Sequence, residues 1–416
     1  MNIDVTKLDS LTDGDIAAWQ ALQRANPDCD SPFLHYQFAR CVSRARDDVY
    51  VATLRGCEKI GTGTSQLREI LAKHRHPLGA SPIFSQPLRE PSEVLGFFPF
   101  QRGERRIGCG LALPLADHQG MVAPSDLSVD VRELLRACDL AAVHFDHLLA
   151  SQTAFQPYHS RLDDSPYVGL TDGYAAYRQQ VEQSGSSLFA QIDRKSRKVQ
   201  RELGPLRLEW HDDSTSIVDT MIQWKQQQLA AAGYRDLYAL PWVRELIHQV
   251  LHSDSSDFAG RMATLLAGDK LLSIHLGIQS GHVLASWIPT YNPAYAAHSP
   301  GLLLHDQLFR HAPLEGIERV ELGRGYNQLK RRFMSGATQV AMGALDRRFL
   351  HRMVRATWYR TRDLVYATPL RRGPLRAYRK LRNQLAAAAS FIGSSTRPLA
   401  VSSRFRRQPP RPTNGS

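Results

Sequence analysis

The sequence predicts an α/β fold, in which helices alternate with strands along most of the chain. Three largely apolar segments follow one another at 258–267, 270–279 and 283–291, with short turns between them. A helical segment at 300–312 and another strand at 320–322 come next, which is typical of a sheet with a helical connection. The chain has 416 residues, enough for two or three domains.

The first predicted unit covers residues 1–165. Its expected elements are helices at about 14–25, 32–42 and 130–140, and strands at 49–54, 94–100 and 142–144. Residues 55–93 separate two of these strands and are rich in Gly, Pro, Ser and basic residues, so we interpret them as a loop insertion. The polar, Pro-terminated segment 163–166 is expected to be a linker that ends the unit.

The second predicted unit covers residues 166–345 and has the clearer pattern. A helical stretch at 174–203 is expected to break at 184–187, and the basic face of its second half to be either solvated or functional. The remaining elements are expected at 206–210 (strand), 216–231 and 240–251 (helices), 328–334 (short helix) and 340–345 (strand).

The turn between the strands at 270–279 and 283–291 sets their pairing. If Ser280 and Gly281 form a two-residue turn, Ile278 lies opposite Val283. The same count places His275 opposite Ser286, on a polar face of a central hairpin.

Positive charge is concentrated at the C-terminal end. The formal net charge is +12, but residues 346–416 contain 17 Lys and Arg against 2 Asp and Glu. We expect a basic tail, 346–416, that is helical at first and then disordered. Three roles stay open for it: contact with an anionic membrane surface, binding of a polyanion, or a packing helix with a solvated extension. The near-neutral body makes nucleic acid an unfavoured partner.

Several classes are excluded by pattern. The N-terminus lacks an apolar leader, and no apolar run approaches the roughly 18 residues of a membrane helix. The five cysteines show no metal-binding or redox spacing, so we expect no metal site. A cytoplasmic protein is predicted, with peripheral attachment to the inner membrane face as an option for the tail.

The segment before residue 302 has the features of an anion site. Ser299 can cap a helix, Pro300 suits its first position, and Gly301 lets a ligand approach the backbone. Free backbone N–H groups at such a helix start can hold a pyrophosphate.

An ordered set of residues then suggests a family. Tyr291, Ser299-Pro300-Gly301, Gly323, Gly325, Lys330 and Ser335-Gly336 occur in that order. Residues 188–345 thereby resemble the acetyltransferase domain of cellulose-biosynthesis (CelD/BcsL-type) proteins, a FemAB-like branch of the GNAT superfamily. The resemblance implies two tandem GNAT-like (acyl-CoA N-acyltransferase) halves that use acetyl-CoA or another acyl-CoA as co-substrate. It assigns the CoA contacts to the helix start: His298, Ser299, Gly301, Leu302 and Leu303.

Acyl transfer to an amine is helped by a general base and by a proton donor for the leaving thiolate. His275 is the first candidate base because imidazole titrates near neutrality. Glu321 is the second; it stands where the family usually has aspartate, and a solvated strand-end carboxylate is the structural alternative. Tyr326 is the candidate donor to the thiolate.

Four further residues are candidates for acceptor binding. Lys330 can meet a phosphate or another acidic group, Asp117 can line a cleft between the halves, and Trp287 and Tyr291 can form a pocket wall. The resemblance implies an acceptor amine on a sugar, polysaccharide precursor or related envelope metabolite. Two alternatives stay open: FemAB-style aminoacyl transfer from tRNA, which a long helical arm would favour, and a non-catalytic scaffold held at the membrane by its tail.

Overall fold

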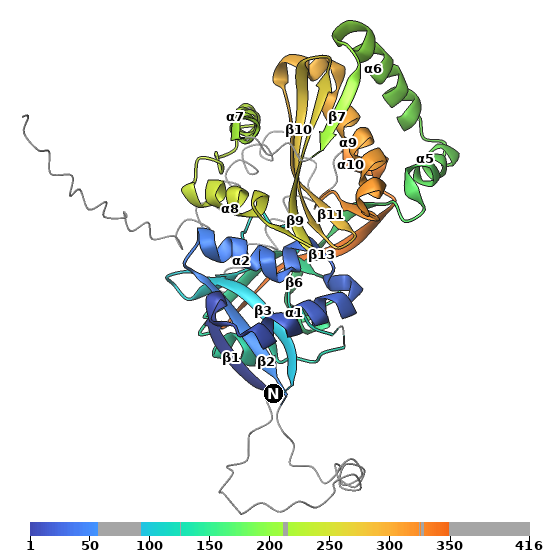
Figure 1. Ribbon diagram of the computed structural model, residues 1–416. Coiled ribbons are helices and arrows are strands. Elements are labelled where there is room, and N and C mark those ends of the chain that lie inside the picture. Colours follow the sequence, from blue (N-terminus) through green and yellow to red (C-terminus); the bar gives the residue numbers. More distant parts are fainter. Residues whose placement is uncertain (57–92, 125, 211–214, 324, 326–327, 349–416) are drawn as a thin grey trace, which may run out of the picture.

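A computed structural model describes residues 1–56, 93–124, 126–210, 215–323, 325 and 328–348. Most of the expected insertion at 55–93, and the basic tail beyond residue 348, lie outside these residues. The described part forms one 13-stranded sheet with helices on both faces (Figure 1). None of its helices is long and apolar enough to cross a membrane.

The N-terminal half begins with a strand that the sequence did not predict, β1. Its elements are β1 (Asn2–Lys7), α1 (Asp13–Ala25), α2 (Tyr36–Ala45), β2 (Val49–Arg55), β3 (Val94–Arg102), β4 (Ile107–Cys109), α4 (Val131–Ala137), β5 (Ala142–Leu149) and β6 (His159–Gly169). Neighbouring strands from β1 to β4 are antiparallel, and β5 then pairs with β4 in parallel.

The C-terminal half repeats this plan. Its elements are α5 (Gly173–Gln183), α6 (Leu188–Leu203), β7 (Leu206–Trp210), α7 (Thr215–Ala231), α8 (Pro241–Leu251), β8 (Asp254–Ser255), β9 (Phe258–Ala267), β10 (Lys270–Ser280), β11 (Val283–Tyr291), α9 (Pro300–His311), β12 (Arg319–Glu321), α10 (Gln328–Phe333) and β13 (Gly336–Asp346). Strands β7, β9, β10 and β11 are antiparallel neighbours, and β12 joins β11 in parallel after the helix α9. The expected tandem of GNAT-like halves is confirmed.

The two halves exchange strands at their junction. β13, the last strand of the described residues, lies between β5 and β6, and β6 lies between β13 and β12. The segment 163–166 is therefore not a linker but the middle of β6, and the boundary expected at 165/166 falls inside a strand. Residue pairs such as Ala337 with Pro166 join positions far apart in sequence, which no local pattern indicates.

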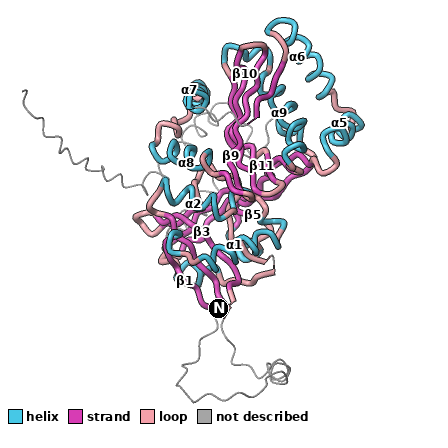
Figure 2. The backbone as a smooth tube through the Cα atoms, viewed as in Figure 1, coloured by secondary structure: helices cyan, strands magenta, loops and turns pink. Residues whose placement is uncertain are grey.

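Helices cover the C-terminal sheet on both faces. α7 and α8 lie on one side of β9–β11, and α5, α6 and α9 lie on the other (Figure 2). α8 packs against α2, so a continuous apolar core joins the halves on the α7 side. Trp19 in this core is fully buried and stacks on Phe97 at 4.9 Å between ring centroids. This packing fixes the halves relative to each other and defines the surroundings of β11.

Candidate active site

The sheet opens between β11 and β12. The two strands pair in parallel over three residues, with Ala285 opposite Glu321 as the last pair. β11 continues to Tyr291 beside β10, but no described strand lies along its other edge there. Backbone groups on that edge are therefore available to a ligand that enters the gap.

A β-bulge in β11 lies at the start of this gap. Leu276 pairs with Ile288, whereas Ile278 pairs with Ala285, so β11 has one residue more than β10 between these pairs. A bulge changes the direction of local side chains and backbone groups, and bulges are frequent beside active sites.

The start of α9 stands directly after this open edge. Ser299 has left-handed backbone angles (φ 55°, ψ 53°), and its side chain makes no capping hydrogen bond. A Cβ added to Gly301 would meet no atom within 4 Å, so the surface there is open. The side chains of Leu302 and Leu303 are both buried in the core. A ligand at the helix start would therefore meet the backbone of these residues and not their side chains. The uncapped, positively polarised helix start is suited to an anion.

Contacts from α6 fix the segment that leads into α9. His298 Nε2 lies 3.1 Å from Glu202 Oε2, and Lys195 Nζ donates to the carbonyl oxygen of Ala297 at 3.2 Å. The basic face of α6 is thus placed beside the helix start, and at least Lys195 has a structural contact.

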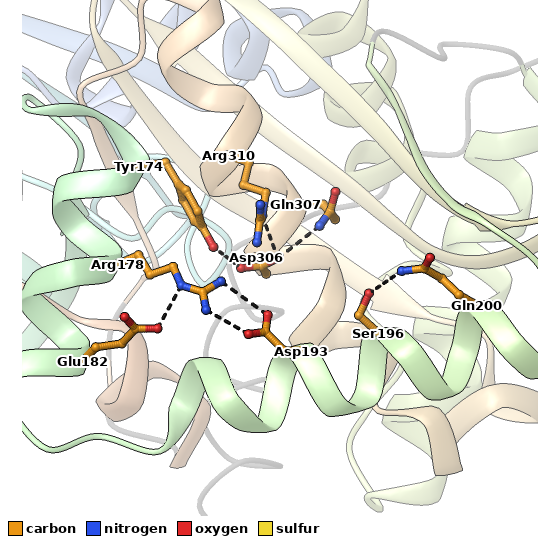
Figure 3. Close-up of polar contacts among 9 residues, drawn as sticks. All are labelled: Tyr174, Arg178, Glu182, Asp193, Ser196, Gln200, Asp306, Gln307 and Arg310. Atoms are coloured by element: carbon orange, nitrogen blue, oxygen red, sulfur yellow. Dashed lines mark hydrogen bonds and ion pairs between the residues drawn. The ribbon is translucent and has the colours of Figure 1, made fainter.

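The buried carboxylate of Asp306, in the middle of α9, binds side chains of α5 and of α9 itself. It accepts hydrogen bonds from the Tyr174 hydroxyl of α5 and from Arg310 Nε, at 3.1 Å for the second (Figure 3). Arg178 of α5 in turn pairs with Asp193 of α6 at 2.8 Å. These bonds join the three helices α5, α6 and α9.

His275 lies on β10, fully buried beside the bulge. Its Nε2 is 2.9 Å from Ser286 Oγ, so the expected closeness of these residues is confirmed although the pairing differs. Its Nδ1 has no hydrogen-bond partner among the described residues. Burial, and then the charges of His305 and Lys225, lower the pKa of His275 to about 3. The expectation of a histidine titrating near neutrality is corrected: the imidazole is neutral at pH 7.

The predicted pairing of β10 with β11 is wrong for two reasons: the turn lies one residue later than expected, and the bulge shifts the pairing again. Ser280 pairs with Val283, so Gly281 and His282 form the turn, and Gly281 takes a φ of 51°. His275 consequently pairs with Pro289 along the backbone rather than with Ser286.

Glu321 is buried, not a solvated strand end. Its carboxylate accepts from Ser31 Oγ at 2.7 Å and from Arg319 at 3.3 Å, and it lies 3.4 Å from His118 Nδ1. His118 Nε2 lies 3.2 Å from Ser165 Oγ. Glu321 thus faces the junction between the halves, on the same side of the sheet as α7.

Asp117 and Trp287 face the same junction. Asp117 packs against Gly323, just after β12, and lies 3.7 Å from His147 Nε2. The Trp287 indole N–H donates to the carbonyl oxygen of Leu115 at 2.9 Å. Asp117, Trp287 and Glu321, which are far apart in sequence, are therefore brought together around one loop of the N-terminal half.

The other candidates lie around the gap itself. Tyr291 stands half-exposed at the open end of β11, and Lys330 of α10 donates to the carbonyl oxygen of Gly323 at 3.0 Å. Tyr326 lies outside the described residues.

Three residues near the gap were not singled out from the sequence. Lys225 and Gln228 lie on α7, and His305 lies on the buried side of α9. Gln228 Nε2 donates to Thr290 Oγ1 at 3.0 Å. A detectable signal existed for two of them: Lys225 and His305 each occupy a position in the apolar stripe of their helix.

The equivalent place in the N-terminal half is closed. Asp130 caps α4 through its side chain, which accepts from the N–H groups of Arg132 and Glu133. The Gln119 side chain fills the space beside Gly110, where an added Cβ would come within 2.4 Å of it. An anion site like that of α9 is therefore absent from the described N-terminal half.

Comparisons with known proteins agree with this architecture. Residues 186–331 match the family model of the acetyltransferase (GNAT) domain. No curated protein matches the chain in sequence. The solved structure of FemX is 9% identical, with 86% of this chain and 99% of FemX covered and a TM-score of 0.51.

Two other solved structures are less similar in shape. The C-terminal domain of a putative lysylphosphatidylglycerol synthetase from Agrobacterium fabrum is 12% identical, with 83% and 95% of the two chains covered and a TM-score of 0.46. A tandem GNAT protein from the clavulanic acid biosynthesis pathway is 10% identical, with 83% and 98% covered and a TM-score of 0.43. The family match falls on α6 to α10, the half that carries the open helix start.

Proposed function

Starting from an acyltransferase enzyme of the GNAT type, we propose that the chain transfers an acyl group, most simply acetyl, from acyl-CoA to an amine. One observation carries the proposal: the uncapped start of α9 directly follows the separated edge of β11. An anionic phosphate at Ser299–Leu303 would use the positive polarity of the helix start. A thioester arm would use the edge of β11 that has no described neighbouring strand.

The reaction needs little from the protein beyond placement and polarisation. The amine nitrogen attacks the thioester carbon, a C–N bond forms, and the C–S bond breaks with its electron pair on sulfur. One proton leaves the amine and one reaches the thiolate, so charge balances. In this proposal, backbone N–H groups at the bulge of β11 would stabilise the oxyanion. His275, neutral and bonded to Ser286, is suited to hold this edge in place or to relay a proton, and Glu321 is the alternative base.

For the acceptor we propose an amine on a sugar, polysaccharide precursor or related envelope metabolite. Its support is the ordered motif set of cellulose-biosynthesis acetyltransferases in the sequence. For the basic tail we propose contact with an anionic membrane surface from the cytoplasmic side, supported by its 17 Lys and Arg.

The aminoacyl-tRNA alternative receives no added support from the described helices. The longest is α7, with 17 residues, and it packs on the sheet instead of projecting as an arm.

Calorimetric titration with acetyl-CoA, followed by thiol release with an amine panel, tests the proposal. We expect saturable binding and acceptor-dependent release of one thiol for each amine acylated. Binding without release by any amine would favour the scaffold, and no binding of acetyl- or longer acyl-CoA would overturn the acyltransferase proposal.

A further inference from the structure

Lys225 is a positively charged residue at a position of α7 where the helical spacing of buried residues predicts an apolar side chain. On α7 it follows Val218, Met221 and Ile222 at the spacing of one helix face, and all three are buried. Trp224 beside it is also buried, so Lys225 lies at the contact between α7 and the sheet rather than on the solvent side.

The neighbouring turn of α7 locates this face. Gln228, three residues after Lys225, donates to Thr290 Oγ1 at 3.0 Å, near the open end of β11. Residues three apart share a helix face, so Lys225 points toward the same strand. In addition to burial, the positive charge of Lys330 lowers the pKa of Lys225, and the positive charge of Lys225 lowers the pKa of His275, so the three side chains lie in one neighbourhood. Lys225 therefore stands at the β11–β12 gap, on the face opposite α9.

Lys225 makes no hydrogen bond or ion pair with any described residue. Arg319, by contrast, pairs with Asp30 and Glu321, and Arg178 pairs with Glu182 and Asp193. An ammonium group that is partly removed from water without a partner is costly, unless a ligand supplies the counter-charge.

We propose that Lys225 binds an anionic group, a carboxylate or a phosphate, of the acceptor. The inference rests on the proposed function, because it assigns the α7 side of the gap to the acceptor and the α9 side to the donor. Lys330 adds a second positive charge near the gap, although its Nζ already donates to Gly323. The preferred acceptor class is therefore an amine with a carboxylate or phosphate in the same molecule.

The lysine is charged at the pH of the cell. Burial, and then the charge of Lys330, lower the pKa of Lys225 to about 8, so most molecules carry the proton at pH 7. A bound anion favours the protonated form. The preference for an anionic acceptor should accordingly decline when the pH rises above about 8.

The test compares matched amines that differ by one anionic group. Glucosamine 6-phosphate with glucosamine tests phosphate, and lysine with its amide tests carboxylate. For one of these pairs, kcat/KM from thiol release should favour the anionic member by about tenfold or more in the wild type. Lys225→Met should remove that preference, so that the two members of the pair react with similar kcat/KM. Lys225→Arg should retain most of it, and the exposed control Lys270→Met should retain all of it.

Two binding measurements distinguish a failure of the Lys225 inference from a failure of the proposed function. Acetyl-CoA should bind Lys225→Met as it binds the wild type; a large loss would move Lys225 to the donor site and overturn the inference. With the donor site saturated by acetyl-CoA, inorganic phosphate should bind the wild type and the Lys270→Met protein more tightly than Lys225→Met.

The inference would be overturned if all three proteins bound phosphate equally. It would also be overturned if the wild type acylated both members of each amine pair at equal rates. In either case the acyltransferase proposal would stand. If no amine of either pair accepts the acyl group, the proposed function is what has failed, and the phosphate titration still decides whether Lys225 binds an anion.

Discussion

The imidazole Nε2 of His275 lies 2.9 Å from the hydroxyl oxygen of Ser286, and this contact joins β10 to β11 at the bulge. Because His275 is fully buried, its pKa falls from 6.5 to about 3. The unfolded chain therefore takes up a proton near pH 6.5 that the folded chain refuses until about pH 3, and acid in this window weakens the fold.

His275→Gln should remove this source of acid sensitivity. Whatever stability the wild type has over the variant at pH 7.5 should shrink as the pH falls from 6.5 toward 4.5, by up to about 1.4 kcal/mol per pH unit. Urea unfolding of both proteins across this range measures the difference. A difference independent of pH would mean that His275 is not held neutral in the fold.

Gly301→Glu should abolish binding of acetyl-CoA without unfolding the protein. The new side chain meets no atom at its Cβ, and a carboxylate in the first turn of α9 favours the helix while it repels a phosphate. Gly301→Ala is the matched control and should bind the donor nearly as the wild type does. Calorimetry reports affinity and thermal unfolding reports the fold; retained affinity in the Glu variant would place the donor elsewhere.

One acyl-CoA should bind to each chain. The helix start of the N-terminal half is capped by Asp130, and Gln119 fills the space beside Gly110. Calorimetric stoichiometry near one, with no residual binding in Gly301→Glu, is the expected result. A stoichiometry near two would show that the N-terminal half opens for a second donor.

Removal of the Glu321 carboxylate should destabilise the fold whether or not it takes part in chemistry. Glu321→Ala leaves Ser31 without its acceptor and removes one of two carboxylates that pair with Arg319. We expect a loss of about 3 kcal/mol in the free energy of unfolding, against about 1 kcal/mol for Ser31→Ala. If Glu321→Ala unfolds as the wild type does but loses activity, the residue acts in catalysis and not in joining the halves.

A chain that ends after residue 348 should keep its sheet and its donor site. β13 ends at Asp346, and Arg347 N donates to the carbonyl oxygen of Ala141 at 2.9 Å, so every described strand is retained. The shortened protein should bind acetyl-CoA with unchanged affinity and should no longer float with vesicles that contain anionic lipid. Flotation of both proteins to the same extent would exclude the tail as the membrane contact.

Most secondary structure could be predicted from local pattern. The strands β9 and β11 have the bounds that the sequence indicated, and α5 and α6 separate at the expected break. Hydrophobic periodicity and turn residues decide such elements within a few positions. The α9 start was predicted for the same reason, because Pro300 and Gly301 are local signals, although Ser299 does not cap through its side chain.

What depends on distant partners could not be predicted. The residues of β6 include Asp163, Asp164 and Pro166, which are typical of a linker, and only pairing with β12 and β13 makes them a strand. The burial of Glu321 likewise depends on Ser31, 290 residues away. The position of Lys225 in the apolar stripe of α7 is visible in the sequence, but its lack of a described partner is known only from the structure.

The exchange of strands delays the completion of the N-terminal sheet during synthesis. While the ribosome produces the C-terminal half, β5 of the N-terminal half waits with one edge unpaired, because its neighbour β13 is made nearly 200 residues later. An uncovered edge is a template for pairing with other chains. The nascent protein should therefore depend on protection of this edge until β13 emerges. Messages truncated before residue 336 should yield aggregation-prone products rather than a smaller working enzyme.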